Sequence, residues 1–122
     1  MEFISNSQIK TFVNNGFESE QLLFPENSLS ERVTITRVTI SPGASNQRHR
    51  HESSEQIWIA LKGCGTLLLE EAGEKAFQEG DVVRFADNDI HGLRNDSGQN
   101  FVYMAITSPP INFRKAYKDE KK

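Results

Sequence analysis

Residues 43–63 read GASNQRHRHESSEQIWIALKG, and this stretch joins a glycine turn, two histidines and an apolar run. Within it, His49 and His51 stand two positions apart. Because side chains in an extended strand alternate between its faces, we expect both imidazoles on one face and Arg50 on the other. Two neutral imidazoles on one face can share a divalent transition metal. The stretch therefore predicts one half of a metal site.

The other half lies downstream in residues 80–95, which read GDVVRFADNDIHGLRN. His91 follows a polar turn there, and it is the last of the three histidines in the chain. A third imidazole from another strand, together with one oxygen ligand, would fill most of a four- or six-coordinate shell.

The two stretches resemble the paired motifs of the cupin family, G-x5-H-x-H-x3 or 4-E-x6-G and G-x5-P-x-G-x2-H-x3-N. The resemblance covers residues 43–95 and departs from the pattern at Ala86, where the family has proline, and at Asn88, where it has glycine. Asparagine tolerates a positive φ, so we expect the turn before His91 to persist.

The resemblance implies an all-β fold, a double-stranded β-helix or jelly-roll barrel, formed by one domain over residues 1–122. It also implies a homodimer and a divalent transition metal such as Fe, Mn, Zn or Ni. His49, His51 and His91 would be three of the metal ligands.

The fourth ligand is ambiguous, because the family allows two spacings. Counting back from Gly63 gives Gln56, whereas counting on from His51 gives Glu55. We favour Gln56, because the apolar run IWIALK fixes its distance from Gly63. With Gln56 the site keeps the full +2 charge of the metal, and with Glu55 the charge falls to +1, which weakens its attraction for an anionic substrate.

Composition excludes several classes of protein. A chain of 122 residues forms one domain, and a net charge of −3 without a basic stripe argues against nucleic acid. No apolar run is long enough for a membrane helix, and no secretory signal is visible, so we expect a cytoplasmic protein. Cys64 is the single cysteine, and we interpret it as a small residue in a tight turn.

Short apolar or β-branched runs separated by glycine, asparagine and aspartate predict many strands. Residues 9–13 could form a short helix or a strand. We expect strands at 20–24, 31–41, 48–51, 56–61, 66–71, 75–78, 81–86, 91–95 and 101–106. Pro109 and Pro110 should end the last strand. In the tail, 111–122, we expect the apolar start to pack on the barrel and the charged end to be solvated.

Other residues near the motifs have two interpretations each. Inward positions could line a substrate pocket or simply fill the core, and these are Trp58, Phe85, Leu93 and Tyr103. Glu52, Glu55 and Tyr103 are candidates for proton transfer, although loop carboxylates are usually only solvated. Arg48 and Arg50 should face away from the metal. Asn95 should serve a turn.

Because a fold does not determine a function, we consider three hypotheses for what the protein does. The first is a metal-dependent enzyme that acts on a small oxygen-rich molecule, such as a sugar acid, carboxylate or diketone, by isomerase, lyase or dioxygenase chemistry. The second is a non-catalytic module that binds a small molecule or carbohydrate. In the third, the metal only stabilises the barrel. Because imidazole binds metal only when it is deprotonated, acid should release the metal.

Overall fold

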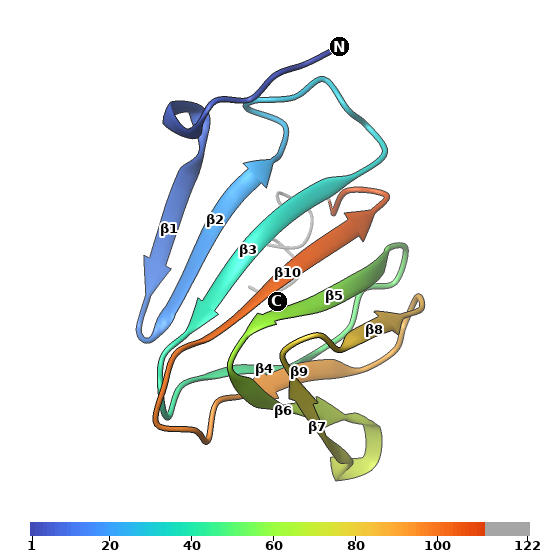
Figure 1. Cartoon of the computed structure of the whole chain (residues 1–122). Coiled ribbons are helices and arrows are strands. Elements are labelled where there is room, and N and C mark those ends of the chain that lie inside the picture. Colours follow the sequence, from blue (N-terminus) through green and yellow to red (C-terminus); the bar gives the residue numbers. More distant parts are fainter. Residues whose placement is uncertain (112–122) are drawn as a thin grey trace.

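The computed structural model describes residues 1–111 and consists of two antiparallel β-sheets (Figure 1). The six-stranded sheet has the order β1-β2-β3-β10-β5-β8, and the four-stranded sheet has the order β4-β9-β6-β7. The strands are β1 (Lys10–Asn14), β2 (Phe17–Leu23), β3 (Thr34–Ile40), β4 (Ser45–His49), β5 (Glu55–Lys62), β6 (Cys64–Leu69), β7 (Glu74–Gln78), β8 (Val82–Phe85), β9 (His91–Arg94) and β10 (Phe101–Ser108).

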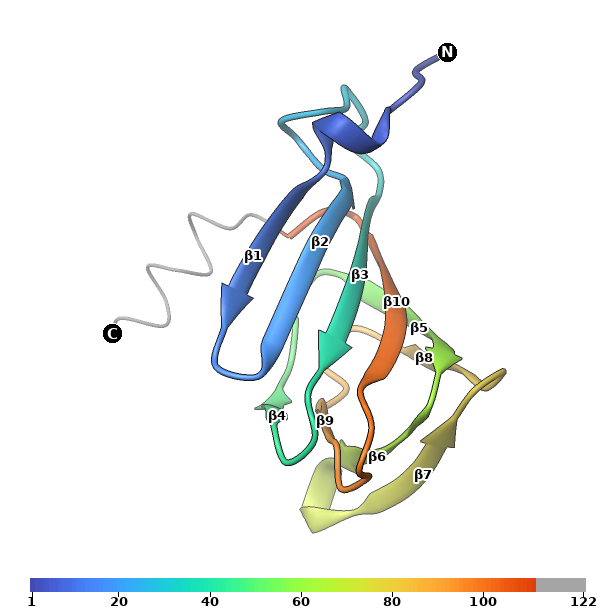
Figure 2. The ribbon, with the colours of Figure 1, turned by 60° about the vertical axis from the view of Figure 1, so that its left-hand side comes forward.

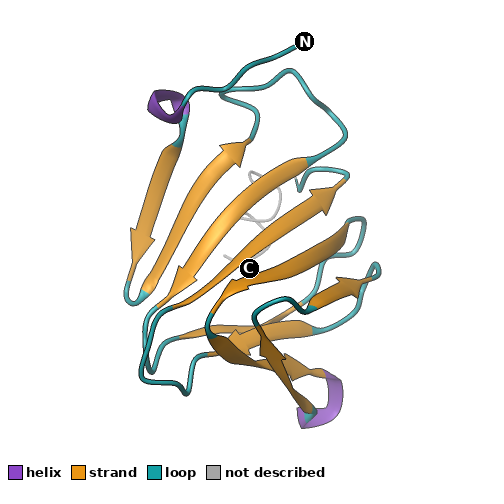
Figure 3. Ribbon diagram, in the orientation of Figure 1, coloured by secondary structure: helices purple, strands orange, loops and turns teal. Residues whose placement is uncertain are grey.

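Helical structure in the described part of the chain amounts to two short 3-10 turns, η1 (Asn6–Gln8) and η2 (Glu70–Ala72) (Figure 3). No helix in residues 1–111 is both long and apolar enough to cross a membrane. The expected all-β jelly-roll is therefore confirmed.

The strand predictions hold with local corrections. Residues 9–13, left open between helix and strand, fall mostly in β1. The predicted strand 66–71 stops at Leu69, because Glu70 begins η2. The turn predicted around Cys64 is shorter, since Gly63 alone separates β5 from β6 and Cys64 is an exposed residue of β6. β10 ends at Ser108, directly before the two prolines. The prediction for residues 112–122 lies outside the described residues.

The core lies between the inner faces of the two sheets. Strict alternation along β10 buries Phe101, Tyr103 and Ala105, while the residues between them are less buried. The register pairs Tyr103 with Ala60 and Val38, and so one row crosses three strands. The four-stranded sheet contributes Leu67, Phe77 and Leu93 to the same hydrophobic core. The apolar period of two in the sequence thus produces this core.

The edge of the six-stranded sheet is less covered than its centre. β1 is exposed along its whole length. Figure 2 shows β1 and β2 as the outermost pair of strands, farthest from β6 and β7. β1 and β2 take no part in the candidate site, whose residues come from β4, β5, β9 and β10 and the loop after β4.

Candidate metal centre

The three histidines lie close together where β4 ends and β9 begins. Each offers one ring nitrogen, and these three nitrogens lie within 4.8 Å of one another. His49 ends β4 and His91 begins β9, and the two are direct cross-strand partners. The centroid of the His49 ring is 5.0 Å from that of the His51 ring and 4.4 Å from that of the His91 ring. The predicted histidines are thus brought together.

The reason for their convergence differs in part from simple strand alternation. β4 ends at His49, so His51 lies beyond the strand. The pairing of β4 with β9 shifts register between Asn46 and His49. A β-bulge of this kind re-aims a side chain. His49 thus reaches His91 as its cross-strand partner after the register shift, whereas His51 joins the two from the loop that follows β4.

Gly92 makes the bulge possible. A Cβ atom at this position would lie 2.6 Å from the carbonyl oxygen of Asn46 and 2.9 Å from the backbone nitrogen of Arg48. Both of these atoms belong to the backbone of β4, which cannot easily move aside. Glycine at this position therefore allows the strand that carries His49 to approach the strand that begins with His91.

The turn before His91 absorbs both departures from the cupin pattern. Asn88 has φ of 70°, the conformation for which the family uses glycine. The Asp89 carboxylate accepts a hydrogen bond from the backbone N–H of Ala86, 2.8 Å away. The expected survival of the turn is confirmed. As expected too, Asn95 serves a turn, since its side chain contacts the backbone of Ile40 and residues 97 and 99.

Backbone carbonyls fix the tautomers of two rings. Nδ1 of His49 lies 2.7 Å from the carbonyl oxygen of Gln47, and Nδ1 of His91 lies 2.8 Å from that of Asp89. A carbonyl oxygen only accepts, so each Nδ1 carries the hydrogen. Nε2 of each ring then presents a lone pair, which is the arrangement that metal-binding histidines use.

His51 is the third ring of the cluster. Its Nε2 is buried, and among the described residues it has no hydrogen-bond partner. Native proteins rarely leave a buried polar atom unpaired, and one explanation is an ion at the site. The His51 ring lies in the same cluster as the other two rings, with its centroid 5.0 Å from that of His49 and 5.3 Å from that of His91.

Burial keeps two of the rings neutral. Desolvation, with a smaller contribution from His49, lowers the pKa of His51 to about 4. Desolvation likewise lowers the pKa of His91 to about 4, against an opposing hydrogen bond to the Asp89 backbone. Both imidazoles are therefore unprotonated at neutral pH and available as ligands.

Gln56 lies beside the histidines, as the favoured spacing predicts. It is buried on the inner face of β5, and its Oε1 is 3.1 Å from Nε2 of His91. Trp58 donates its indole N–H to the same Oε1 at 3.1 Å, and Nε2 of Gln56 donates to the Thr107 hydroxyl at 2.9 Å. An indole N–H can only donate, so the atom facing His91 is the amide oxygen.

Two hydrogen-bond acceptors consequently face each other. Oε1 of Gln56 and the bare Nε2 of His91 have no hydrogen to share across their 3.1 Å. Protonating His91 would supply one, but burial disfavours the charged ring. A divalent cation held by the three Nε2 atoms and this Oε1 would satisfy all four. The donor set therefore fits a metal.

The other carboxylate and phenol candidates lie elsewhere. Glu55 is on the opposite face of β5 from Gln56, where its carboxylate accepts from Arg84 at 2.8 Å. Glu52 is exposed on the loop after His51. The Tyr103 hydroxyl is fully buried and accepts from the Asn46 amide, and desolvation raises its pKa. The cluster itself contains none of these three side chains.

The four residues predicted either to line a pocket or to fill the core all belong to the hydrophobic core. The Phe85 ring stacks on His91 with centroids 4.4 Å apart, and the Trp58 ring meets His91 edge-on at 5.4 Å. Tyr103 packs on Trp58, and Leu93 is fully buried next to Gly65. Phe85 and Trp58 thus form the apolar wall of the cluster.

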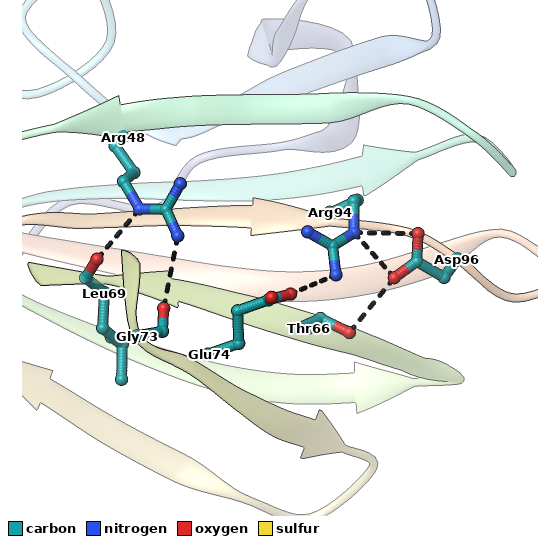
Figure 4. A network of polar contacts seen from close by, with 7 residues as sticks. All are labelled: Arg48, Thr66, Leu69, Gly73, Glu74, Arg94 and Asp96. Carbon is teal, nitrogen blue, oxygen red and sulfur yellow. Dashed lines mark hydrogen bonds and ion pairs between the residues drawn. The ribbon is translucent and has the colours of Figure 1, made fainter. Parts of the chain in front are cut away.

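Arg48 has a structural role, of which the sequence predicted only that the side chain faces away from the metal. As expected it does not join the histidines. Its guanidinium donates to the carbonyl oxygens of Leu69 and Gly73, at 2.9 and 3.3 Å (Figure 4). The same view shows Arg94 between Glu74 and Asp96. These contacts tie β4 and β9, the two strands that carry histidines, to the β6–β7 hairpin.

Sequence reasoning missed Thr107 and Gly92. Thr107 lies next to Gln56 only because β10 pairs with β5 in the observed register, and no local motif encodes that pairing. Gly92 did carry a signal, since an isolated glycine within a strand often marks a close approach of backbones.

The chain spans about half the length of two plant auxin-binding proteins that it matches. It is 31% identical over 90 residues to auxin-binding protein 1 of Arabidopsis thaliana, a match that covers 66% of this chain and 45% of the relative. Two solved structures share the fold at 18% identity. KdgF from Halomonas sp. has a TM-score of 0.76, covering 92% of this chain and 98% of that one.

The second structure is the polyketide cyclase RemF from Streptomyces resistomycificus. It has a TM-score of 0.78, and the match covers 90% of this chain and 80% of that one. The sequence model described as "Cupin domain" matches residues 36–107, a range that includes both halves of the histidine cluster. Together with the two-sheet barrel, this match shows that the chain belongs to the cupin family.

Proposed function

We propose that this cupin is a metal-dependent enzyme that acts on a small, oxygen-rich molecule such as a sugar acid, carboxylate or diketone. The proposal depends chiefly on the two facing acceptors, Gln56 Oε1 and His91 Nε2, beside the Nε2 of His51, which has no hydrogen-bond partner within residues 1–111. That arrangement is costly in a protein without a bound cation and favourable with one.

His49, His51, His91 and Gln56 would hold the metal through three nitrogens and one oxygen. Such a set suits Fe, Mn, Zn or Ni. When bound, the ion would supply Lewis-acid chemistry for isomerase or lyase reactions, or redox chemistry for a dioxygenase if it is iron. Because all four ligands are neutral, these residues would leave the site with its full positive charge.

Polar side chains next to the cluster support an oxygen-rich ligand. In the register of the six-stranded sheet, Gln56, Thr107 and Thr34 form one inward-facing cross-strand row. Thr36 and Gln21 form a second pair on the same face. Hydroxyl and amide groups in this position can donate to and accept from the oxygens of a sugar acid. Farther from the cluster, the same face becomes apolar with Val38 and Ile40.

A proton-transfer group has to come from near the site. Of the three candidates, Glu55 is paired with Arg84 and Tyr103 is buried with a raised pKa. Glu52 remains, because it directly follows His51 and is exposed. We propose Glu52 as the first residue to test for this role.

The alternative is a binding module without catalysis. One relative is named for auxin binding, and this name favours a small-molecule ligand in a cupin that shares 31% identity with the chain. The two functions differ in turnover: a binding module would hold an oxygen-rich ligand in a metal-dependent way and release it unchanged.

We also propose that the protein forms a homodimer through the outer face of the six-stranded sheet. Aliphatic side chains fill the centre of this face, and we call them the outer apolar face: Ile35, Ile57, Ile59, Leu61, Val82, Val102, Met104 and Ile106. Val82 is 63% exposed, and the four-stranded sheet lies on the other side. Two ion pairs, Arg84–Glu55 and Arg37–Glu20, lie on the same side of the sheet and neutralise their own charges, so two copies could meet without repulsion.

We propose a cytoplasmic location for the protein. The free thiol of Cys64 is exposed and would be oxidised easily in an oxidising compartment.

Metal content tests the central proposal. Protein purified without chelator, or reconstituted with Fe, Mn, Zn or Ni, should contain about one equivalent of metal, and His51→Ala and His91→Ala variants should lose it. Loaded protein is then screened against sugar acids, hydroxycarboxylates and diketones, with Glu52→Gln as a comparison. Less than about a tenth of an equivalent after reconstitution would overturn the proposal.

A further inference from the structure

We propose that Trp58 is a positioning residue, which fixes the side-chain amide of Gln56 with its oxygen, and not its NH2 group, toward the three imidazoles. This inference rests on the proposed metal site. It concerns how the metal-free protein keeps the amide oxygen of Gln56 oriented to serve as the fourth ligand.

The amide of Gln56 has two orientations that differ by a half-turn. In the observed one, Oε1 faces both Trp58 and His91 at 3.1 Å, and Nε2 faces Thr107 at 2.9 Å. In the other orientation, the NH2 group would face Trp58 and His91, and the oxygen would face Thr107. The three neighbours do not favour the same choice.

Two of the neighbours do not favour the observed orientation. The Thr107 hydroxyl can accept from NH2 or donate to the oxygen, so it serves both orientations equally. His91 has its hydrogen on Nδ1, which donates to the Asp89 carbonyl, and its Nε2 is an acceptor. Without a metal, that nitrogen would be better satisfied by the NH2 group. Left to His91 alone, the amide would turn its ligand atom away from the site.

Trp58 decides the matter because an indole N–H can only donate. If the NH2 group faced it, two donors would meet and a buried indole N–H would lose its acceptor, which is costly in a protein interior. The ring cannot turn aside easily: Trp58 is 1% exposed and packs between Phe85 and Tyr103, with centroids at 5.0 and 4.5 Å. The indole therefore holds the oxygen in place.

The test is a double-mutant cycle in which Zn²⁺ affinity is measured by calorimetry on the full chain. Trp58→Phe keeps an aromatic ring but removes the donor, and we expect Zn²⁺ binding to weaken by about 10-fold or more. A carboxylate presents oxygen in either orientation. In the Gln56→Glu background, Trp58→Phe should therefore cause little or no loss, so the two changes should be strongly non-additive.

Thr107→Val is the matched control. It removes a hydrogen bond that does not choose an orientation, so its effect should be similar in both backgrounds. If Trp58→Phe also weakened Zn²⁺ binding equally in both backgrounds, the indole would act by packing alone and the inference would be overturned. Thermal melts of each metal-free variant show whether it is folded.

A second readout needs no metal. Trp58 is the sole tryptophan, so the indole N–H gives one resonance in a nitrogen-proton spectrum. Its chemical shift should move in Gln56→Leu, which removes the acceptor, and stay nearly constant in Thr107→Val. An unchanged resonance in Gln56→Leu would contradict the hydrogen bond on which the inference rests. Wild-type protein that binds none of Zn²⁺, Fe, Mn and Ni would overturn the proposed function instead, whatever this spectrum shows.

Discussion

The backbone N–H of Asn88 donates a hydrogen bond to the carbonyl oxygen of His51, with 2.8 Å between nitrogen and oxygen. Asn88 belongs to the turn that delivers His91, and His51 is the last histidine of the first motif. The two motifs are thus joined by their backbones as well as by the cluster of three histidines to which both contribute. His51 has left β4 by this point, so the turn of the second motif holds it in place.

The first prediction concerns this turn. Asn88 has φ of 70°, so Asn88→Gly should change stability little, whereas Asn88→Val should destabilise the fold by about 1–3 kcal/mol. Because His51 and His91 are both tied to the turn, Asn88→Val should also weaken metal binding. Urea unfolding and metal titration check both effects. Equal behaviour of the two variants would contradict a role for the positive φ.

Gly92→Ala should disturb the cluster without touching a ligand. The added methyl group would meet the backbone of Asn46 and Arg48 at under 3 Å, so β4 must shift. We expect a loss of about 1–3 kcal/mol in the free energy of unfolding, together with weaker metal binding. Gly98→Ala is a suitable control, because a Cβ atom there meets nothing within 4 Å. Similar results for both variants would argue against the close approach.

The metal-free protein should lose stability as pH falls from about 6.5 to about 4. His51 and His91 have folded-state pKa values of about 4, below the ordinary value of 6.5, so the unfolded chain binds more protons in this window. Above about pH 6.5 these two groups contribute no pH dependence. Urea unfolding of chelator-treated protein measures the slope, and the double variant His51→Gln/His91→Gln should show a smaller one. If the double variant had the same slope of unfolding free energy against pH as the wild type, both rings would be easily protonated in the folded protein.

Gln56→Glu should change what the loaded site attracts. A carboxylate would strengthen Zn²⁺ binding but lower the net charge of the centre from +2 to +1. Binding of an anionic probe such as oxalate to the Zn²⁺-loaded protein should therefore weaken by about 10-fold or more, with a smaller effect on a neutral sugar. Calorimetry with both probes separates charge from shape. Stronger oxalate binding by the variant would refute the role assigned to a neutral ligand.

Ile59→Glu should separate the proposed dimer. Ile59 pairs with Met104 and Val82 at the centre of the outer apolar face. Two buried carboxylates would face each other across a symmetric interface, so we expect a monomer in analytical ultracentrifugation. Leu29→Glu provides the control, because Leu29 is 91% exposed and lies outside this face. A wild-type monomer at all concentrations would remove the dimer from consideration.

The sequence predicts most of the fold because short strands with a period of two leave few alternatives. It also identifies the three histidines and favours Gln56, since the apolar run after Gln56 fixes its distance from the motif glycine. It does not identify Thr107 as the partner of Gln56, because the pairing of β10 with β5 joins residues 51 positions apart. Nor does it reveal that Trp58 donates to Gln56, since its position on the inner face predicts burial and not a particular hydrogen bond.

Strand β5 carries the candidate site on one side and the proposed dimer surface on the other. Gln56 and Trp58 face inward, while Ile57 and Ile59 face outward. Inserting or deleting one residue ahead of this strand would exchange the two sets at once, placing aliphatic groups among the imidazoles and an amide on the subunit surface. Point substitutions, by contrast, can alter either side alone. The candidate site and the proposed dimer surface can therefore be redesigned independently, provided that the register of this single strand is kept.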